Sequence, residues 1–589
     1  MDHPSNMKMI TKLLFRLLPI QILLAAVGAV NGIVSSYFAT NYVGVDAMSA
    51  VGLYSPVNML ISSLSYILVS GSVILCGEYL GKNRRDEMQG VFSLTLTLSV
   101  AIGLLFTLLY VFLGLFHLTG FMTRDPVVRP LFDQYLLGQA AGLIPLLLGN
   151  CFASFLSLEN KWKLTFMASL VYIVVNLLLN YLFVCLFRLE AIGLALASSL
   201  GMWVFMAVQA RYFFSGRSAF RFSLSNVAWR ETGSIIRIGL PGSLTYVYQT
   251  ARGLIVNNLL AVYVGLVGVS AFATADNLMH IFWAIPGGMI AVSRMQMSVS
   301  SGEEDRQTLT DVMRVMFLRF IPLMCMVCAG IILCAVPLTR LFFRDSAEPV
   351  YWMTVHGLRI LPLCMSFSII CMHFTCYGQI SGKQLLVHLL SAFDGVVCVA
   401  GFTALLIRSL GIDSAYIANV LNGVVTTLTV ILYSWIRKKR FPRNMDDLMV
   451  IPDDFGAPEN ERMDLSITNI EEVSSISQKV QSFCLERGAD ARRSMLAGLS
   501  MEEMAGNIIE HGFTKDEKKH SVDIRVVHKD GDFILRIKDD CIPFDPGERL
   551  KMAGGDDVTK NIGIRMVFRI ARDVQYQNVL GLNVLTIRV

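Results

Sequence analysis

Long apolar runs alternate with short polar connections over roughly the first three quarters of the chain. A helix needs about 20 mostly apolar residues to cross the hydrocarbon core of a bilayer. The pattern therefore predicts twelve membrane-spanning helices, and their even number places both ends of this region on one side of the membrane. The expected spans are 14–40, 51–79, 91–117, 132–156, 164–187, 191–213, 236–263, 270–297, 312–339, 352–376, 384–408 and 413–436.

Basic residues are divided unevenly between the two ends of these spans. The connections on the side of the N-terminus include Lys82, Arg84, Arg85 and the basic run at 437–440. Cytoplasmic connections are enriched in Lys and Arg. We therefore expect a multi-pass protein of a bacterial inner membrane with both termini in the cytoplasm. The opposite connections carry only Arg124, Arg129, Arg188, Arg340, Arg344 and Arg408.

The spans repeat as two sets of six. Leu18-Pro19 recurs as Leu240-Pro241, and the string beginning at Tyr42 recurs at Tyr263, at a nearly constant offset. Two copies with an even number of spans share one topology, and such bundles can rock about a central cavity. The repeat predicts lobes at 1–222 and 223–440. It favours a carrier over a channel or a membrane-embedded receptor.

Ionisable side chains inside the spans gather in the second repeat, at Arg252, Asp276, His280 and Asp394. Such groups are costly in a membrane and usually face a cavity, so we expect them to form a transport and cation-coupling site. Asn31 occupies the position of the first repeat that corresponds to Arg252. Asp276 and His280 are four residues apart on one helical face, as a proton or cation relay requires. Alternatively, Arg252 pairs with Asp276 or Asp394 only to hold helices together.

The composition agrees with a membrane protein and reveals a second part. Of the 589 residues, 54% are hydrophobic and 16% are charged, whereas soluble domains carry about 25% charged residues. Charge is sparse up to about residue 435 and then rises to the level of a soluble domain. We expect a linker at 441–460 and a separate domain at 461–589. A nucleic-acid partner is not expected, because no basic run is interleaved with aromatic residues.

The pattern of the tail predicts an α+β sandwich. Within its second helix, Glu503, Asn507 and His511 stand four residues apart and share a face. A carboxylate beside an amide suits general-base work next to a phosphate bound to Mg2+. A solvated polar stripe is the alternative. Strands are expected at 463–468, 521–528, 532–539, 574–578 and 583–589, and helices at 470–487, 489–511 and 562–572.

The membrane part resembles the multidrug and toxic compound extrusion (MATE) transporters. The resemblance rests on Leu18-Pro19, YVGVDAMSAVGLYSPVN from Tyr42, its echo YVGLVGVSAFATADN from Tyr263, and GEYLGKNRRDE from Gly77. It implies an all-α membrane domain of two six-helix lobes, a central cavity, and export of amphipathic or cationic compounds coupled to entry of H+ or Na+. Many members carry an acid in the first span where this chain has Ser35. Either coupling runs through the second repeat, or this carrier is not coupled in the way familiar from the family.

The tail resembles the histidine-kinase-like ATP-binding domains, most closely the anti-sigma-factor serine kinases. The resemblance rests on EEMAGNIIEHGF, DDCIPFDP and NIGIRMVFRIARDVQY, in this order. It implies that Glu503 is the catalytic base and that Asn507, with His511 on the same helix, holds Mg2+ and nucleotide. It also implies that Asp539 binds the adenine of ATP and that Gly563 belongs to the loop that closes on the phosphates.

Two residues depart from that family pattern. Cys541 and Asn561 stand where the family usually has glycine. Each adds a side chain where the backbone approaches the nucleotide. The departures count against kinase activity more than against ATP binding.

The sequence thus predicts an exporter whose cytoplasmic domain binds ATP and regulates either transport or a cytoplasmic protein partner. Two other functions stay open. One is a membrane sensor whose tail is a serine/threonine kinase of the anti-sigma-factor type. The other is a flippase for lipid-linked saccharides.

Overall fold

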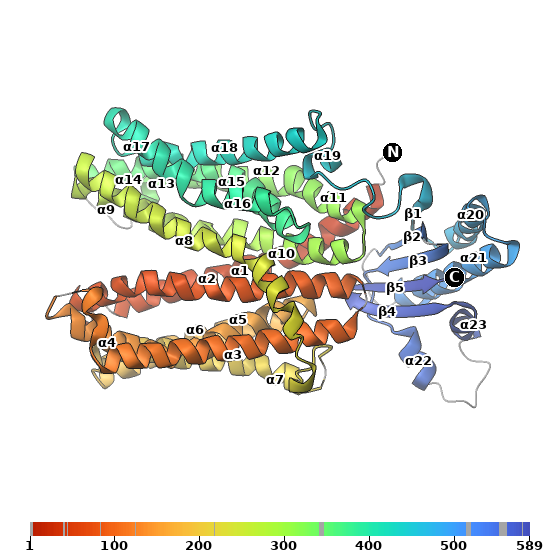
Figure 1. Ribbon diagram of the computed structural model, residues 1–589, viewed down its shortest axis with the longest axis horizontal. Coiled ribbons are helices and arrows are strands. Elements are labelled where there is room, and N and C mark those ends of the chain that lie inside the picture. Colours follow the sequence, from red (N-terminus) through yellow and green to blue (C-terminus); the bar gives the residue numbers. More distant parts are fainter. Residues whose placement is uncertain are drawn as a thin grey trace.

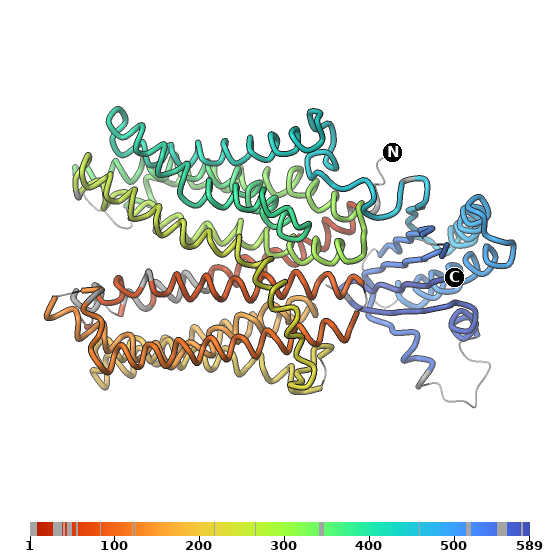
Figure 2. The backbone as a smooth tube through the Cα atoms, in the orientation of Figure 1, coloured from red at the N-terminus to blue at the C-terminus, as the bar shows by residue number. Residues whose placement is uncertain are grey.

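The computed structural model consists of a long helical body with a smaller α+β domain at one end (Figure 1). It describes the chain except for residues 1–3, 39–41, 44, 83, 124, 217, 341–346, 514–519, 530, 553–561 and 580. The helical body is divided into two lobes that lie side by side, as the tube through the Cα atoms shows (Figure 2).

The first lobe is built from helices of the first repeat. Apolar side chains fill its interior, and leucine and phenylalanine side chains also line its outer surface, as expected of helices that face lipid. Its helices are α1 (Pro4–Phe38), α2 (Val45–Gly81), α3 (Arg85–Leu115), α4 (Val128–Ala140), α5 (Leu143–Leu158), α6 (Trp162–Asn180) continued by η3 (Tyr181–Leu186), and α7 (Glu190–Phe214).

The second lobe repeats this order. Its helices are α8 (Thr232–Tyr263), α9 (Leu266–Phe282), α10 (Ala284–Gly302), α11 (Arg306–Val315) continued by η6 (Met316–Phe320) and α12 (Ile321–Leu333), α13 (Ala335–Arg340), α14 (Pro349–Ile360), α15 (Pro362–Ile380), α16 (Gln384–Ala392) continued by η7 (Phe393–Val397) and α17 (Cys398–Leu410), and α18 (Asp413–Lys438).

In the described part of the chain, each of the twelve expected spans is occupied by one helix or by consecutive helices. By length and composition, nine helices of the described chain can cross a membrane, or eleven if each of the two bent pairs, α4 with α5 and α9 with α10, is one span. The helix outside this count is α8, which occupies the seventh expected position. Its interior carries Arg237, Gln249 and Arg252, which make it more polar than its neighbours.

The internal repeat is visible in the irregularities of the helices. Pro19 lies inside α1, and Pro241 lies inside α8 at the corresponding position. The fourth span breaks between α4 and α5, and the tenth breaks at Leu361 between α14 and α15. Helix breaks therefore recur at matching places in both lobes, as two copies of one ancestral unit predict.

The two lobes touch most closely at their ends nearest the α+β domain. A Cβ added at Gly77 of α2 would collide with Ser298 of α10, and one added at Gly302 would collide with the carbonyl oxygen of Glu78. Only glycine permits so close an approach of two helix backbones. These ends of the lobes are therefore packed shut.

The α+β domain follows a short helix, α19 (Met445–Met449), within the segment expected to be a linker. Its five strands form one antiparallel sheet in the order β1-β2-β3-β5-β4. Apolar side chains of α20, α21 and α23 cover one face of this sheet and form a separate core. The elements are β1 (Arg462–Ile467), α20 (Glu472–Glu486), α21 (Ala491–Gly512), β2 (Val522–Lys529), β3 (Asp532–Asp539), α22 (Pro546–Met552), α23 (Ile562–Ile570), β4 (Asp573–Val579) and β5 (Leu582–Arg588).

The other face of the sheet is charged and meets the turn between α10 and α11 of the second lobe. The side chains of Glu303 and Asp305 in this turn are only 1% and 2% exposed. Asp305 pairs with Arg525 of β2, and the Lys538 ammonium of β3 lies 2.7 Å from Glu303. Burial alone would raise the pKa of Asp305, but the charges of Arg525 and Lys538 hold it well below its usual range. We call this cluster the acidic turn joint.

The α+β domain also contacts the first lobe. Lys12 of α1 pairs with Asp540, and Arg85 of α3 donates a 2.9 Å hydrogen bond to the carbonyl oxygen of Tyr576 in β4. Burial would raise the pKa of Asp540, but Lys12 and His520 lower it below its ordinary value. One small domain thus touches both lobes at the ends where the lobes are packed together.

The carboxyl of Asp523, on the charged face of β2, predicts a pH-dependent stability. Burial raises its pKa to about 6, although Lys538 and Arg525 nearby oppose this shift. A raised pKa gives stability that is full below the unfolded value near pH 4 and is lost as the pH rises through 6. Asp523→Asn should therefore stabilise the domain at pH 7.5, by up to about 2 kcal/mol, and much less at pH 4.5.

Hydrogen exchange of the β2 and β3 amides in the full-length protein measures this effect. Glu486→Gln is the matched control, because the Glu486 side chain is 72% exposed. Equal protection of Asp523→Asn and the parent chain at pH 7.5 would contradict the prediction.

Candidate functional site

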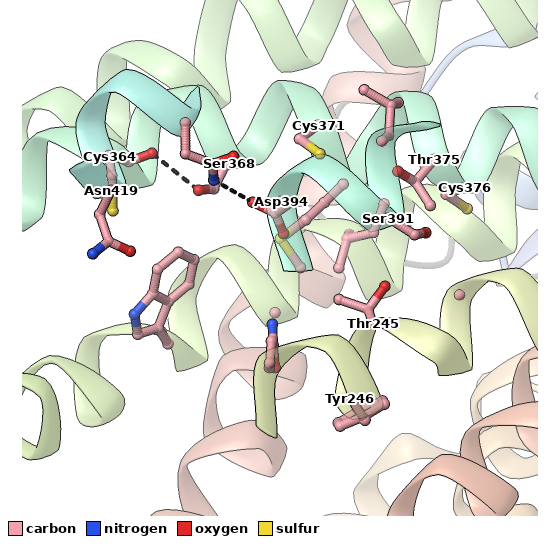
Figure 3. Close-up of a pocket in the computed structure, with 18 of the residues that line it drawn as sticks. Thr245, Tyr246, Cys364, Ser368, Cys371, Thr375, Cys376, Ser391, Asp394 and Asn419 are labelled. Atoms are coloured by element: carbon pink, nitrogen blue, oxygen red, sulfur yellow. Dashed lines mark hydrogen bonds between the residues drawn. The ribbon is translucent and has the colours of Figure 1, made fainter. Parts of the chain in front are cut away.

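The second lobe contains a cavity of about 590 Å³ whose lining mixes polar and apolar side chains. Arg252, Asp276, His280 and Asp394, the four residues expected from the sequence, all line it. They come from three spans: α8, α9 and the π-helical turn η7. Figure 3 shows Asp394 and neighbouring residues such as Ser368, Ser391 and Asn419 around this space. The structure thus brings together residues that lie up to 142 positions apart.

Asp394 lies in the π-helical turn η7, and both its side chain and its backbone oxygen accept hydrogen bonds. Its Oδ1 accepts a 2.8 Å hydrogen bond from Nδ2 of Asn422 on α18. Nη1 of Arg252 donates to the backbone oxygen of Asp394, at 3.4 Å, and no ion pair between Arg252 and either Asp394 or Asp276 occurs among the described residues. The alternative of a simple helix-holding ion pair does not describe this arrangement. The carboxylate keeps an oxygen available to a ligand.

Asp276 and His280 form the expected pair on one face of α9. Nε2 of His280 lies 3.5 Å from Oδ2 of Asp276, and the two side chains are 63% and 48% exposed. A carboxylate and an imidazole at this distance can share or exchange a proton. They border the same cavity as Asp394, so a bound cation or proton could reach all three.

A second cavity of about 490 Å³ lies in the first lobe, and its lining is neutral except for one residue. It includes Gln21, Asn150 and several serines. The expected partner in this lobe, Asn31, has a side chain outside the described residues. Sequence reasoning missed Arg294, which borders both cavities, and Asn422. Arg294 could have been found by its position, since it lies inside an expected span as Arg252 does.

The expected nucleotide site lies in the α+β domain. Glu503 and Asn507 are half-buried on α21, whereas His511 is exposed at its end. Gly563 begins α23 directly against Glu503: a Cβ added there would collide with Oε2 of Glu503. The first and third sequence blocks are thus adjacent in space, with the Glu503 carboxylate against Gly563. A carboxylate and an amide on one face of α21, beside the start of a helix, form a donor set that suits the Mg2+ and phosphates of the expected ATP.

The second block contributes a buried carboxylate. Asp539, at the end of β3, is 3% exposed, and its Oδ1 accepts hydrogen bonds from Nδ2 of Asn583 (2.7 Å) and the amide of Cys541 (2.9 Å). Burial raises its pKa. Cys541, one of the two departures, is buried with its sulfur toward Gly512 at the end of α21. Its side chain packs against that helix. Asn561, the other departure, lies outside the described residues.

Comparisons with known proteins agree with this two-part architecture. Residues 21–182 match the MatE family, and residues 468–589 match the family described as Histidine kinase-like ATPase domain. A probable multidrug resistance protein NorM of Photorhabdus laumondii subsp. laumondii is 23% identical over 332 residues, which are 53% of this chain and 69% of that protein. Another, of Halalkalibacterium halodurans, is 24% identical over 38% of this chain, and the match spans only half of that relative's length.

The helical body has the fold of solved MATE structures. One, described as the outward-facing conformation of a multidrug resistance MATE family transporter of the MOP superfamily, matches with a TM-score of 0.68 and 21% identity over 73% of this chain and 96% of that chain. Both resemblances expected from the sequence are therefore confirmed. The chain is a multi-pass membrane protein that joins a MATE-type membrane part to a C-terminal histidine-kinase-like ATPase domain, and the match to that domain implies ATP binding.

The contact between α21 and α23 at Gly563 predicts how substitutions at this site change nucleotide binding. Asn507→Ala should weaken binding of Mg-ATP to the full-length protein at least about tenfold, because a charge-assisted contact to the metal is lost. Gly563→Ala should weaken it as well, since its Cβ collides with Glu503. Isothermal titration in detergent micelles measures both effects.

Glu502→Gln is the control for these variants, because it neutralises the acid next to Glu503 without touching the shared face of α21. The assignment of the site fails if Asn507→Ala binds Mg-ATP as tightly as the parent chain does.

Proposed function

We propose that this protein is a secondary transporter of the MATE type that exports drugs or other amphipathic, cationic compounds in exchange for H+ or Na+. The observation that carries the proposal is the clustering of Asp276, His280 and Asp394 in one membrane cavity. These are the groups through which a coupling ion can bind, because a carboxylate can hold a proton or a cation and an imidazole can hold a proton.

The packed ends of the lobes support a particular state of the transport cycle. Tyr66, Tyr246 and Arg294 at the cavity floor lie just beyond the glycine contacts that shut the ends near the ATPase domain. With both termini in the cytoplasm, as the basic connections predict, the cavity is closed toward the cytoplasm. This is the outward-facing state, in which substrate is released and the coupling ion enters.

A test of export uses everted membrane vesicles with an imposed H+ or Na+ gradient and a fluorescent cationic dye. Asp276→Asn and Asp394→Asn should each lower gradient-driven export at least about tenfold, because each removes a charge on which the coupling ion depends. Asp413→Asn is the matched control, since Asp413 lies in the same lobe, paired with His356, outside the cavity. Undiminished transport by both cavity variants would contradict the coupling assignment.

We further propose that the ATPase domain regulates this transport from within the same chain. The domain is fixed to the second lobe by the acidic turn joint and to the first lobe by Lys12 and Arg85. Alternating access requires the shut ends of the lobes to separate, and a domain attached to both resists that separation. Asp540, the partner of Lys12, directly follows Asp539 in the expected adenine site, so nucleotide occupancy can act on the contact with the first lobe. Mg2+ would be held with the nucleotide by Asn507.

Regulation predicts that the response of transport to nucleotide depends on the attachment of the ATPase domain to both lobes. Addition of Mg-ATP to proteoliposomes should change the export rate of the parent protein by about twofold or more, whereas the pair Lys12→Ala with Arg85→Ala should weaken the response, because two contacts between this domain and the first lobe are lost. Arg16→Ala is the control: Arg16 is an exposed base one turn further along α1.

A nucleotide response as large in this double variant as in the parent protein would contradict this mechanism. The substitution Glu503→Gln distinguishes this mechanism from the kinase alternative. If the domain is a kinase, the substitution should eliminate phosphorylation of a serine-bearing partner. Regulation that depends only on nucleotide binding should persist.

A further inference from the structure

Arg294 of α10 lies at the floor of the transporter, where the two lobes meet. It borders the cavity of the second lobe and that of the first, as do Tyr66 of α2 and Tyr246 of α8. Its Nη2 donates a 2.9 Å hydrogen bond to the Tyr66 hydroxyl, and its guanidinium carbon lies 5.3 Å from the centre of that ring. A ligand in either cavity can therefore reach this guanidinium.

No acid neutralises Arg294 among the residues that the structure describes. Its contacts are the tyrosine rings and the Cys376 thiol, and its buried Nε has no hydrogen-bond partner there. Gln379, which is 2% exposed and lies with Tyr66 against Gly242, also leaves both amide atoms without a partner. Buried charges in proteins are normally paired, because removing them from water is costly. Arg294 thus brings a positive charge without a neutralising acid to the lining of both cavities.

The cavity lining carries as many arginines as acids, whereas an exporter of cations would be expected to have an excess of acids. Asp276 and Asp394 bring two negative charges, and Arg252 and Arg294 bring two positive ones. Arg252 lies beside Asp394 and donates a hydrogen bond to the backbone oxygen of that residue. The acids therefore gather at one side of the space, with Arg252 among them, whereas the charge of Arg294 stands by itself at the floor.

We infer that the transported compound carries an oxyanion, such as a carboxylate, which binds Arg294 while its cationic part faces Asp276 and Asp394. The substrates are then amphipathic zwitterions. Guanidinium presents a planar fork of donors that matches carboxylate geometry, and two tyrosine rings beside it suit the apolar part of such a molecule. This inference rests on the proposed export function and names its substrate class.

A matched pair of dyes tests the inference. Tetramethylrhodamine methyl ester is a cation, and tetramethylrhodamine with its free carboxylate is a zwitterion of nearly the same size. Fluorescence polarisation measures binding of each dye to the purified full-length protein at pH 7.5, with no ion gradient. The parent protein should bind the zwitterion about tenfold more tightly than the ester, because one charge-assisted contact distinguishes them.

Variants assign this preference to Arg294. Arg294→Gln should weaken binding of the zwitterion about tenfold and leave the ester unchanged or slightly tighter, since a repulsive charge is gone. Arg294→Lys, which keeps the charge without the fork, should keep part of the preference. Arg252→Gln is the matched control, an arginine of the same cavity beside the acids, and it should keep the preference for the zwitterion.

Two results would overturn the inference. One is a result with the parent protein itself: it binds the ester as tightly as the zwitterion, or it binds neither dye. The other is that Arg294→Gln weakens binding of both dyes equally, while Arg294→Lys keeps the full preference for the zwitterion. Arg294 would then have a purely structural role. Export is judged separately: a protein that prefers the zwitterion but moves neither dye along a gradient disproves the exporter and leaves the binding site in place.

Discussion

The cost of placing charge in hydrocarbon is the constraint on which the rest of this structure depends. The spans contain few ionisable groups, and five of those in the second lobe line one interior cavity, where water can solvate them better than lipid would. This constraint explains why Arg252, Asp276 and Asp394 meet although they lie on different helices. It also ties the position of the site to the fold: the cavity exists where the lobes stop touching.

The cavity that results is electrically balanced. Its acids suit a proton or a cation, and Arg294 at the floor suits an anion, so one space offers both signs of charge along its length. The first lobe contributes mainly neutral hydrogen-bonding groups, such as Gln21 and Asn150. Two lobes that share one fold therefore differ in chemistry: the ionisable groups line the cavity of the second lobe, and neutral hydrogen-bonding groups line most of the cavity of the first.

The cost of burying unpaired charge also governs the acidic turn joint, where the ATPase domain meets the membrane part. Glu303 and Asp305 would be expensive to bury alone, and Arg525 and Lys538 make their burial possible. Because that turn follows the glycine contact at Gly302, the place where the lobes approach most closely is also the place where the ATPase domain is fastened. The domain is thereby positioned to respond to, or to hold, the packing of the lobes.

Much of this could be predicted from local patterns. Apolar runs determined the helical spans, because their length must match the bilayer. The repeat of Leu18-Pro19 at Leu240-Pro241 determined the division into two lobes. Alternation and turn residues placed the strands of the tail within one or two residues, and β3 at 532–539 was predicted with its full bounds. Among the described α-helices and strands of the tail, α22 was missed, because it is short and follows an irregular acidic loop.

Other features depended on contacts between distant segments. The pairing of Asp305 with Arg525 joins residues of two domains, and nothing in either local sequence marks them as partners. The helix-holding pair of Arg252 with an acid was one expected alternative, but the π-helical turn around Asp394 presents its backbone oxygen to Arg252 instead. The sequence by itself determined which elements form and which residues are chemically conspicuous, since both follow from local composition. Tertiary structure alone decided which charges are neutralised and that Arg294 is not, because neutralisation requires two groups to meet in space.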